Sequence, residues 1–350
     1  MTVETPATAG PSLMLRETAE APDVVARQIE ANAAATAELG ARLREAAPAF
    51  VVTCARGSSD SAATYAKYLI EIVLGTVVAS VGPSVTSVYG RRPNMKGALF
   101  VAISQSGRSP DLLTLAEAAR ADGALTVALV NDTSSPLGGL CEVVLPLHAG
   151  PERSVAATKS YIASLAAVLQ LVAAWSADPA LDRAVRRLPD YLDGALKRSW
   201  LDAAPVLQPV AGLYVVGRGP GYAAALEAAL KLKETAGLHA EAGSSAELRH
   251  GPMAIAGPDF PVLLFSQNDS ALPGLAEFGA ELTARGVPVL SAGPAGIPGA
   301  TRLPVAEGVD PFAQPLALIQ SFYPLAEAIA RARGRDPDRP PHLRKVTETL

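Results

Sequence analysis

The sequence is poor in cysteine, histidine and aromatic residues. Among 350 residues there are two cysteines and four histidines, and aromatic side chains make up 5% of the chain. Two isolated cysteines, Cys54 and Cys141, provide no disulfide framework and indicate reduced thiols in a cytoplasmic protein. No histidine is spaced from another histidine or from a cysteine as zinc ligands are, so we expect no metal site.

Blocks of charge and long apolar segments are also scarce. The net charge is −4 and the basic residues form no cluster, so we expect no nucleic-acid partner. The most apolar stretch, residues 161–175, is shorter than the ~20 residues of a membrane span and contains Ser164 and Gln170, so it predicts a buried helix and no membrane partner. Residues 1–12 lack the apolar core of a signal peptide and are expected to form a disordered tail.

Apolar residues make up 49% of the chain, and they occur in short runs that alternate with helical patterns. Continuous Val/Ile/Leu runs between helices are typical of parallel sheets covered on both faces. In the first half we predict strands at 50–54, 77–81, 98–103, 125–130 and 143–147, with helices at 61–73 and 110–121. In the second half we predict strands at 213–216, 262–265, 287–291 and 303–305, with helices at 221–237, 272–284 and 312–333. Pro288 indicates an edge strand there, or a strand that begins at Val289.

Similar turns follow the strands in both halves of the chain. The first half has an Arg-Gly-Ser turn at 56–58 and a Ser-Gln-Ser turn at 104–106, and the second has Arg-Gly-Pro at 218–220 and Ser-Gln-Asn at 266–268. The arginine and the serine are 48 positions apart in both halves. This spacing predicts duplication of one α/β unit, so the fold class is two tandem flavodoxin-like αβα sandwiches.

The proline-rich helical stretch 178–208 predicts the connector between the two domains. We therefore place the first domain at 13–177 and the second at 209–338. Residues 339–350 are expected to form a C-terminal tail that folds back toward the active site.

Two serine-rich turns predict a phosphate or sugar site in the first domain. The turn at 104–111 offers hydroxyl groups, Gly107 and a helix N-terminus with free N–H groups, which suit an anion. The turn at 56–60 ends the neighbouring strand at the same edge of the sheet. In the second domain Asp269 replaces the glycine and would repel an anion. The alternative is that these serines and aspartates only cap helices.

Charged residues on one face of the helix after Gly221 are candidates for catalysis. Glu227, Lys231 and Glu234 are spaced i, i+4 and i+7 in an Ala- and Leu-rich helix. A lysine between two glutamates keeps the carboxylates ionised and available as bases. Spacing alone favours a solvated face with i,i+4 pairing. His250 precedes Gly-Pro in a predicted turn, and Lys345 lies in a basic tail.

Together these motifs resemble the SIS (sugar isomerase) domain family. The resemblance runs from Met14 to Thr347 and is closest to SIS-type glucosamine-6-phosphate deaminases and the isomerase half of glucosamine-6-phosphate synthase. It is carried by the segments at 14–28, 56–71, 104–111, 155–161, 229–252 and 342–347. The block ALKLKETAGLHAEAGSSAELRHGP at 229–252 is its most specific part.

The resemblance implies roles for individual residues. Ser104, Gln105, Ser106 and Ser109 match the phosphate loop. Sugar contacts are implied for a second turn and a backbone segment, made up of Gly57, Ser58, Ser59, Val155, Ala156 and Ala157. Glu234 matches the base that moves a proton between C1 and C2. Catalytic roles are also implied for Lys231, for the ring-opening His250 and for the C-terminal Lys345.

The resemblance also implies an activity and an assembly. The amidotransferase relatives carry an N-terminal glutaminase domain that this sequence lacks, so we expect a glucosamine-6-phosphate deaminase that needs no metal or cofactor. Because the matching histidine of the synthase acts in the partner's site, a homodimer with shared active sites is expected. Alternatives are action on galactosamine 6-phosphate or fructosamine 6-phosphate, simple isomerisation, or a non-catalytic module that senses a sugar phosphate.

Overall fold

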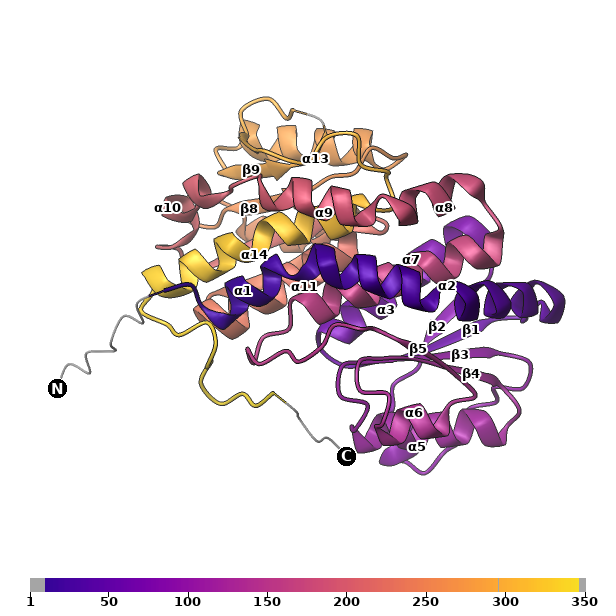
Figure 1. Ribbon diagram of the computed structural model, residues 1–350. Helices are drawn as coiled ribbons and strands as arrows, with labels where there is room; N and C mark the ends of the chain where they lie inside the picture. The colour runs from indigo at the N-terminus through magenta and orange to yellow at the C-terminus, as the bar shows by residue number, and fades with distance from the viewer. Residues whose placement is uncertain (1–9, 295, 346–350) are drawn as a thin grey trace. The chain divides into compact units, whose positions relative to one another are not determined.

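The computed structural model describes residues 10–294 and 296–345, and it divides into two compact units (Figure 1). Unit 1 holds the described residues of 10–20, 152–158 and 192–345. Unit 2 holds residues 21–151 and 159–191. Most of the predicted N-terminal tail and the last five residues of the predicted C-terminal tail lie outside the described residues. Unit 1 therefore takes two short segments, 10–20 and 152–158, from the first half of the sequence.

Unit 2 is built on a five-stranded parallel sheet in the order β2-β1-β3-β4-β5. Its strands are β1 (Val51–Cys54), β2 (Val78–Ser80), β3 (Leu99–Ser104), β4 (Leu125–Val130) and β5 (Val143–Pro146). The central strands β1 and β3 are buried along their whole length, as the continuous apolar runs predict. This is the strand order of a doubly wound sheet. Strand β2 lies on one side of β1 and strands β3 to β5 lie on the other, so the strand order switches between β1 and β3.

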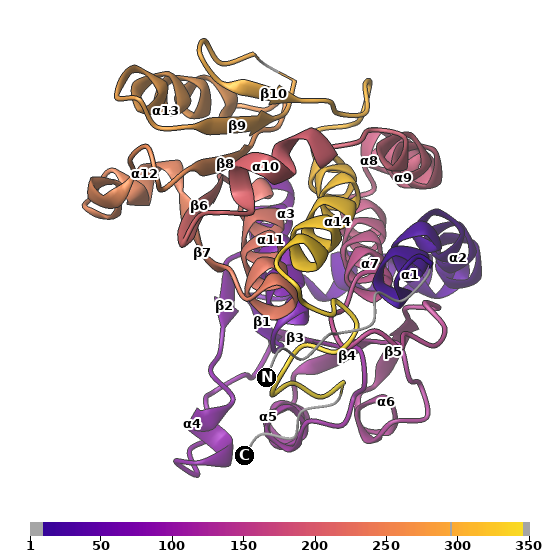
Figure 2. The same cartoon turned by 90° about the vertical axis from the view of Figure 1, so that its left-hand side faces the viewer.

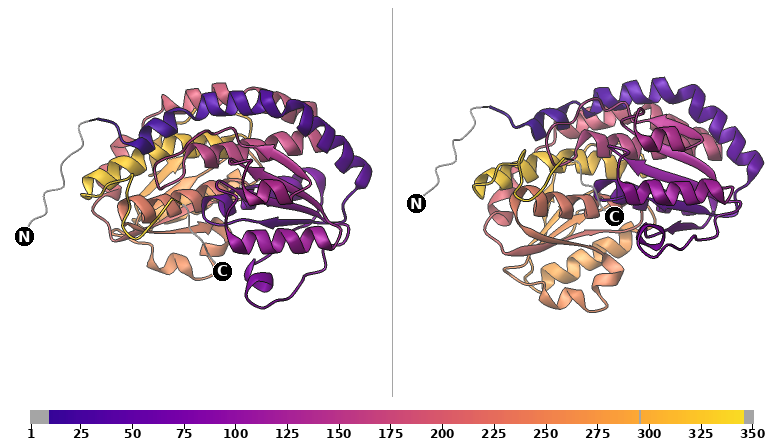
Figure 3. Two further views of the ribbon diagram at one scale, coloured as in Figure 1. Left: turned by 60° about the horizontal axis from the view of Figure 1, so that its bottom comes forward. Right: turned by 90° about the horizontal axis from the view of Figure 1, so that it is seen from below.

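Helices cover both faces of this sheet. One face is covered by α2 (Ala21–Ala46), α3 (Ser58–Leu74) and α7 (Lys159–Ser176), and the other by α4 (Ser84–Ser87), α5 (Pro110–Ala121) and α6 (Pro136–Leu140). The long α2 helix packs along α7 (Figure 3). Almost every side chain of α7 is buried, which confirms the prediction of a buried helix over 161–175. Two further helices, α8 (Pro179–Arg186) and α9 (Leu188–Leu196), follow α7.

Unit 1 contains a second five-stranded parallel sheet in the order β10-β9-β8-β6-β7. Its strands are β6 (Gly212–Gly217), β7 (His239–Ser244), β8 (Val262–Phe265), β9 (Val289–Ala292) and β10 (Thr301–Leu303). Read from the other edge, this is the strand order of the first sheet. One finding corrects the sequence prediction, because β7 was not predicted. Of the two alternatives for Pro288, the strand that begins at Val289 is confirmed, and β9 lies inside the sheet.

The second sheet is also covered on both faces. One face is covered by α11 (Gly221–Ala236) and α14 (Gln314–Ala332), which pack side by side (Figure 2), and α1 (Leu13–Ala19) lies on α14. The other face is covered by α12 (Ser245–Leu248) and α13 (Leu272–Ala284). Short elements complete the unit: η1 (Leu201–Ala203), α10 (Ala204–Leu207) and η2 (Pro252–Ile255). The stretch after α7 is helical as predicted, and the predicted domain boundaries stay a prediction.

A constant shift relates the first four strands of the two sheets in chain order, whereas the fifth strands, β5 and β10, do not follow it. Residues 56 and 104 correspond to residues 218 and 266, a shift of 162 positions. The same shift superposes α3 on α11 and α5 on α13 to within one or two residues at each end. Equal strand order and equal spacing together indicate that one α/β unit was duplicated.

Candidate active site

The predicted phosphate loop follows β3 at the point where the order of the first sheet reverses. Ligands of doubly wound sheets bind at such points, beyond the carboxyl ends of the strands. Gly107 adopts a φ of +64°, and a Cβ at this position would lie 2.1 Å from Ser135 Oγ, so only glycine fits. Ser104 Oγ accepts the N–H of Gly107 at 2.9 Å and closes the loop. The loop is thereby shaped by two of its own residues.

The serine that precedes α5 and the glycine that precedes α3 provide no side-chain helix cap. Ser109 precedes α5, yet its side chain makes no capping hydrogen bond, and Pro110 occupies the first helical turn. Gly57 precedes α3 with a φ of +57° and offers no side chain for a cap. The reading of these residues as mere helix caps is therefore wrong for Ser109. The half-buried predicted contact residues of the two turns are Ser58, Ser59, Gln105, Ser106 and Ser109.

An ion pair ties the two turns together within unit 2. The guanidinium of Arg56 donates from Nε and Nη2 to one carboxylate oxygen of Asp111, at 2.9 and 2.7 Å. Asp111 is completely buried, and its other oxygen accepts the N–H of Leu112 at 2.8 Å. A buried charge of this kind is tolerated because both of its oxygens are satisfied. The pair fixes the β1–α3 turn against the β3–α5 turn.

Glu227, Lys231 and Glu234 form a charged triad on α11 that is mostly buried. Glu227 and Lys231 are fully buried, whereas the side chain of Glu234 is 22% exposed. Lys231 Nζ lies 3.6 Å from Glu227 Oε1 and donates a hydrogen bond to Glu234 Oε2. The interpretation that spacing alone favours, a solvated face with weak i,i+4 pairing, is therefore wrong.

The charges around Lys231 keep it protonated. Burial alone lowers the pKa of Lys231, but the carboxylates of Glu227, Glu234 and Glu152 outweigh burial and raise this pKa above its ordinary value. The lysine lies beside both carboxylates of the triad. Of these two, Glu234 is the one that reaches solvent.

Two residues that the sequence did not single out complete this cluster. Tyr323 on α14 lies with its hydroxyl 3.2 Å from Glu227 Oε1. Glu152 is buried, and its Oε2 accepts a hydrogen bond from Lys345 Nζ at 2.9 Å. The predicted tail lysine is thus paired inside unit 1. Glu152 stands three residues before Val155 in the recognised VAATKS motif, which is the signal that could have identified it.

The predicted sugar-lining segment has a fixed backbone. Glu152 Oε1 accepts the N–H of Thr158 at 2.9 Å, which closes the segment at its far end. Val155 donates its N–H to the carbonyl of Asp338 at 3.3 Å. Ala156 is buried, and Val155 and Ala157 are half-buried. The segment therefore belongs to the same unit as the charged triad.

His250 stands apart from this cluster. It lies in an exposed turn between α12 and η2, where its N–H donates to the carbonyl of Glu247 at 2.9 Å. Within residues 10–294 and 296–345, no hydrogen bond or ion pair joins its imidazole to the triad. The structure thus groups the loop residues in unit 2, groups Lys231, Glu234 and Lys345 in unit 1, and leaves His250 on the surface.

The corresponding loop of the second sheet is filled by the protein itself. Asn268 donates its N–H to Gln314 Oε1 at 2.7 Å, and Asp269 Oδ1 accepts the N–H of Ala271 at 2.9 Å. Gln267 is 1% exposed, and its Oε1 would lie 2.2 Å from a Cβ at Gly221. Burial raises the pKa of Asp269. The two loops therefore differ in structure as well as in sequence, because in the second the N–H of Asn268 is bonded to Gln314 and Asp269 stands in the place of Gly107.

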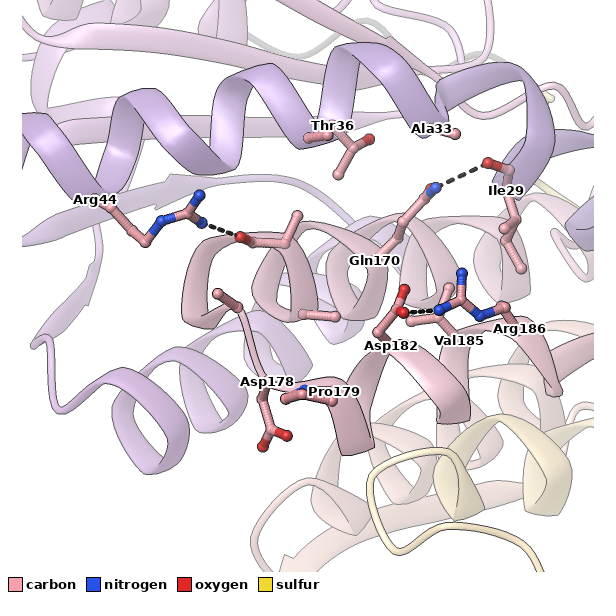
Figure 4. Close-up of a pocket in the computed structure, with 14 residues that line it drawn as sticks. Ile29, Ala33, Thr36, Arg44, Gln170, Asp178, Pro179, Asp182, Val185 and Arg186 are labelled. Carbon is pink, nitrogen blue, oxygen red and sulfur yellow. Dashed lines mark hydrogen bonds and ion pairs between the residues drawn. The ribbon is translucent and has the colours of Figure 1, made fainter.

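A separate cavity of about 490 Å³ lies in unit 2 between α2, α7 and α8 (Figure 4). Its floor is formed mainly by alanine, isoleucine and valine, and its rim carries Arg44, Asp178 and the Asp182–Arg186 ion pair. None of the predicted site residues lines it.

In the described part of the chain, no group of three or more His, Cys, Asp or Glu side chains is placed to hold a metal ion. Among the described residues, no helix is long and apolar enough to cross a bilayer.

These features define an α/β protein of two units, with serine- and glycine-rich strand-to-helix turns in one unit and a mostly buried charged triad in the other. The model of the SIS domain family matches residues 48–174 and 207–291, more than half of the chain. The chain therefore belongs to the SIS domain family, as the motifs of the sequence predict.

Individual relatives agree with this assignment. The chain is 33% identical over 359 residues to the isomerizing glutamine–fructose-6-phosphate aminotransferase of Aeropyrum pernix, covering 96% of this chain and 57% of that protein. A crystal structure of an inferred phosphosugar isomerase from Silicibacter pomeroyi is 44% identical, with a TM-score of 0.89 over 94% of this chain and 100% of that one. The C-terminal domain of a glucosamine-fructose-6-phosphate aminotransferase from Francisella tularensis is 25% identical, with a TM-score of 0.84 over 96% and 100%.

Proposed function

We propose that the chain is an amino-sugar-phosphate deaminase that converts glucosamine 6-phosphate and water to fructose 6-phosphate and ammonia. The observation that carries this proposal is the state of the α11 triad. Glu234 is the only member that reaches solvent, and it is paired with a lysine that is completely buried. A carboxylate at the edge of a buried cluster and next to a protonated lysine is suited to take a proton from carbon.

Binding of the phosphate is assigned to the loop after β3. Ser104, Gln105, Ser106 and Ser109 would donate to the phosphate oxygens, and the N-terminus of α5 favours the negative charge. This interaction is remote from the reacting carbons, so it supplies binding energy without taking part in the chemistry. Gly57, Ser58 and Ser59 would contact the sugar from the neighbouring turn, and the backbone at 155–157 would line it.

The chemistry is a proton transfer followed by hydrolysis. His250 assists opening of the sugar ring, and Lys345 reaches the open-chain substrate. Glu234 takes the proton from C2 of the open-chain aldehyde, which gives an enolamine. Return of a proton to C1 gives an imine at C2. Water then adds to C2, the C–N bond breaks, and ammonia leaves with fructose 6-phosphate as the other product.

The exposure of His250 supports a shared active site. A histidine that has no partner in its own triad can serve the triad of a second copy, so we propose a homodimer in which each subunit supplies His250 to the other. A cytoplasmic location, expected from the two free thiols, is part of the same proposal. Sedimentation at low concentration tests the assembly, and a fully active monomer would refute the shared site.

Isomerisation without loss of ammonia is the second candidate function. It is favoured by the aminotransferase relative of Aeropyrum pernix, whose name includes an isomerizing activity and of which the chain spans 57%. The same base and the same C1–C2 transfer would serve both reactions. In simple isomerisation C2 carries oxygen in place of nitrogen, so the proton transfer passes through an enediol, no imine forms and no ammonia is released.

A substrate panel tests the proposal. Purified protein is mixed with glucosamine 6-phosphate, galactosamine 6-phosphate, fructosamine 6-phosphate, fructose 6-phosphate or unphosphorylated glucosamine, and ammonia and sugar products are quantified. We expect equal amounts of ammonia and fructose 6-phosphate from glucosamine 6-phosphate. Conversion of fructose 6-phosphate to an aldose without any release of ammonia would favour the second candidate. No turnover of any sugar phosphate would leave only a sensing module.

A further inference from the structure

Helix α1 is fixed at its N-terminus by an aspartate from the far end of the chain. Asp338 accepts the N–H groups of Leu13 and Met14 on its two carboxylate oxygens, at 2.7 and 2.8 Å. A carboxylate at this position satisfies free N–H groups and complements the helix dipole. Gln320 on α14 adds a hydrogen bond to the carbonyl of Thr18 at 2.8 Å. This short helix is therefore anchored at both ends within unit 1.

One turn further along, Glu17 holds the start of the sugar-lining segment. It is 4% exposed, and its two carboxylate oxygens accept the consecutive N–H groups of Arg153 and Ser154, the latter at 3.1 Å. Hydrogen bonds to an ionised acceptor are about twice as strong as those between neutral groups. The next N–H, that of Val155, goes to the carbonyl of Asp338 at 3.3 Å. Three successive N–H groups of the segment thus end on Glu17 and Asp338.

Glu17 and Asp338, which we call the clamp, are also linked to the C-terminal lysine. Lys345 follows Asp338 by seven residues and pairs with Glu152, which directly precedes the clamped N–H groups. Both partners of this ion pair are therefore attached to backbone that Glu17 and Asp338 hold in place. The segment MLRET at 14–18 belongs to one of the motifs that carry the family resemblance. The proposed function gives none of its residues a contact with the substrate.

We propose that Glu17 and Asp338 are positioning residues, which set the backbone of Val155–Ala157 and the Lys345–Glu152 pair for catalysis. This inference rests on the proposed function for its kinetic part. The local order of residues 152–158 can be tested without any assumption about the substrate.

The substitution Glu17→Gln tests the clamp. Glutamine keeps the size of the side chain, but its amide nitrogen cannot accept an N–H. We expect hydrogen exchange in the peptide 152–158 to accelerate by roughly 10–100-fold, the equivalent of one lost hydrogen bond to a charged group, with no change in β6 or β8. Glu30→Gln, an exposed glutamate on α2, is the matched control and should leave exchange unchanged.

Kinetics then separate positioning from general stability. We expect kcat/KM of Glu17→Gln to fall by roughly 10–100-fold. Combining it with Lys345→Ala should cost less than the sum of the two single effects, because both act through the same segment. Asp338→Asn loses one of the two acceptor oxygens and should show a partial loss, whereas Asp338→Ala loses both and should show the larger loss. Additive effects of Glu17→Gln and Lys345→Ala would refute the positioning role.

The exchange measurement decides the inference independently of activity. Unchanged exchange at 152–158 in Glu17→Gln, or equal acceleration across the β-sheet, would overturn the clamp. If wild-type protein turns over no amino-sugar phosphate, the proposed function fails while the exchange result still stands. If Glu17→Gln does not fold, Asp338→Ala is measured in its place with the same expected local acceleration.

Discussion

The two units share a strand order and a residue spacing, yet they carry different candidate groups. In unit 2 the loop after β3 keeps Gly107 and half-buried serine hydroxyl groups. In unit 1, the corresponding position is Asp269, the N–H of Asn268 is bonded to Gln314 of α14, and Asp269 accepts the N–H of Ala271. A site of the same ancestry can thus be closed by a few side chains without any change of fold.

The helices that follow the first strand of each sheet, α3 and α11, differ in the opposite sense, because here the second copy carries the polar groups. Under the same shift of 162 positions, Glu227 and Lys231 on α11 correspond to Tyr65 and Leu69 on α3, and Glu234 corresponds to Ile72. Unit 2 therefore has no acid or base at these positions, while unit 1 carries the complete triad. Under the proposed function, one copy supplies the anion loop and the other supplies the groups for proton transfer.

The largest effect that sharpens this comparison is expected from Lys231→Met. Removing the lysine leaves Glu227 buried without its cation, so the free energy of unfolding should fall by about 3–5 kcal/mol. Lys233→Met, two residues further along the same helix and exposed, is the control and should change it by no more than about 0.5 kcal/mol. Chemical denaturation measures both.

The stability of the wild-type protein and that of Lys231→Met should depend on pH in different ways. The pKa of Lys231 is raised in the folded state, so its contribution is fully present below the ordinary lysine pKa of ~10.4 and is lost only at higher pH. In Lys231→Met, the buried Glu227 must take up a proton to be tolerated. The deficit of the variant should therefore shrink as the pH is lowered from 7 to about 5. A deficit that is the same at both pH values would contradict the buried-triad account.

A smaller effect, confined to binding, is expected in unit 2. Ser104→Ala or Ser106→Ala should weaken binding of glucosamine 6-phosphate by about 1.5–3 kcal/mol each, because each removes a hydrogen bond to a charged group. Ser266→Ala, the equivalent of Ser104 in unit 1, should leave binding unchanged. Calorimetric titration measures all three, and equal losses in both units would show that the units are not divided as described.

The smallest effect is expected from Asp269→Asn. If the carboxylate alone kept anions away from the second loop, this change would create a phosphate site. The structure predicts none, because Gln314 and the loop itself occupy the donors. Asparagine keeps the hydrogen bond to Ala271, so stability should change by only a few tenths of a kcal/mol. Titration with inorganic phosphate that reveals a new site would overturn this explanation.

The sequence predicted the fold well where apolar runs were continuous. The strands 125–130 and 262–265 and the helices 110–121 and 272–284 have the predicted bounds, because buried parallel strands need uninterrupted Val/Ile/Leu and Pro110 marks a helix start. Strand β7 was missed since HAEAGS has no β-branched or large apolar residue. It is an edge strand with alternating exposure, held in place by its pairing with β6.

The candidate site was only partly predictable. Motif spacing identified the α11 charges, but spacing cannot show what packs over a helix, so it favoured a solvated face. Tyr323 and Glu152 are contributed by segments distant in sequence, and only the fold reveals that they contact Glu227 and Lys345. Likewise, the closure of the second loop by Gln314 depends on a side chain 46 residues away.

The most direct measurement of the central claim is turnover by Glu234→Gln. Glutamine preserves size and helix propensity but cannot accept a proton, so the variant should fold and bind glucosamine 6-phosphate. We expect release of ammonia and exchange of the C2 hydrogen with solvent to fall together by ~10²–10⁴-fold, the usual contribution of a positioned general base. Glu307→Gln, an exposed glutamate in the same unit, should retain full activity. Near-normal turnover and exchange by Glu234→Gln would contradict the account and direct attention to Glu227 or Glu247.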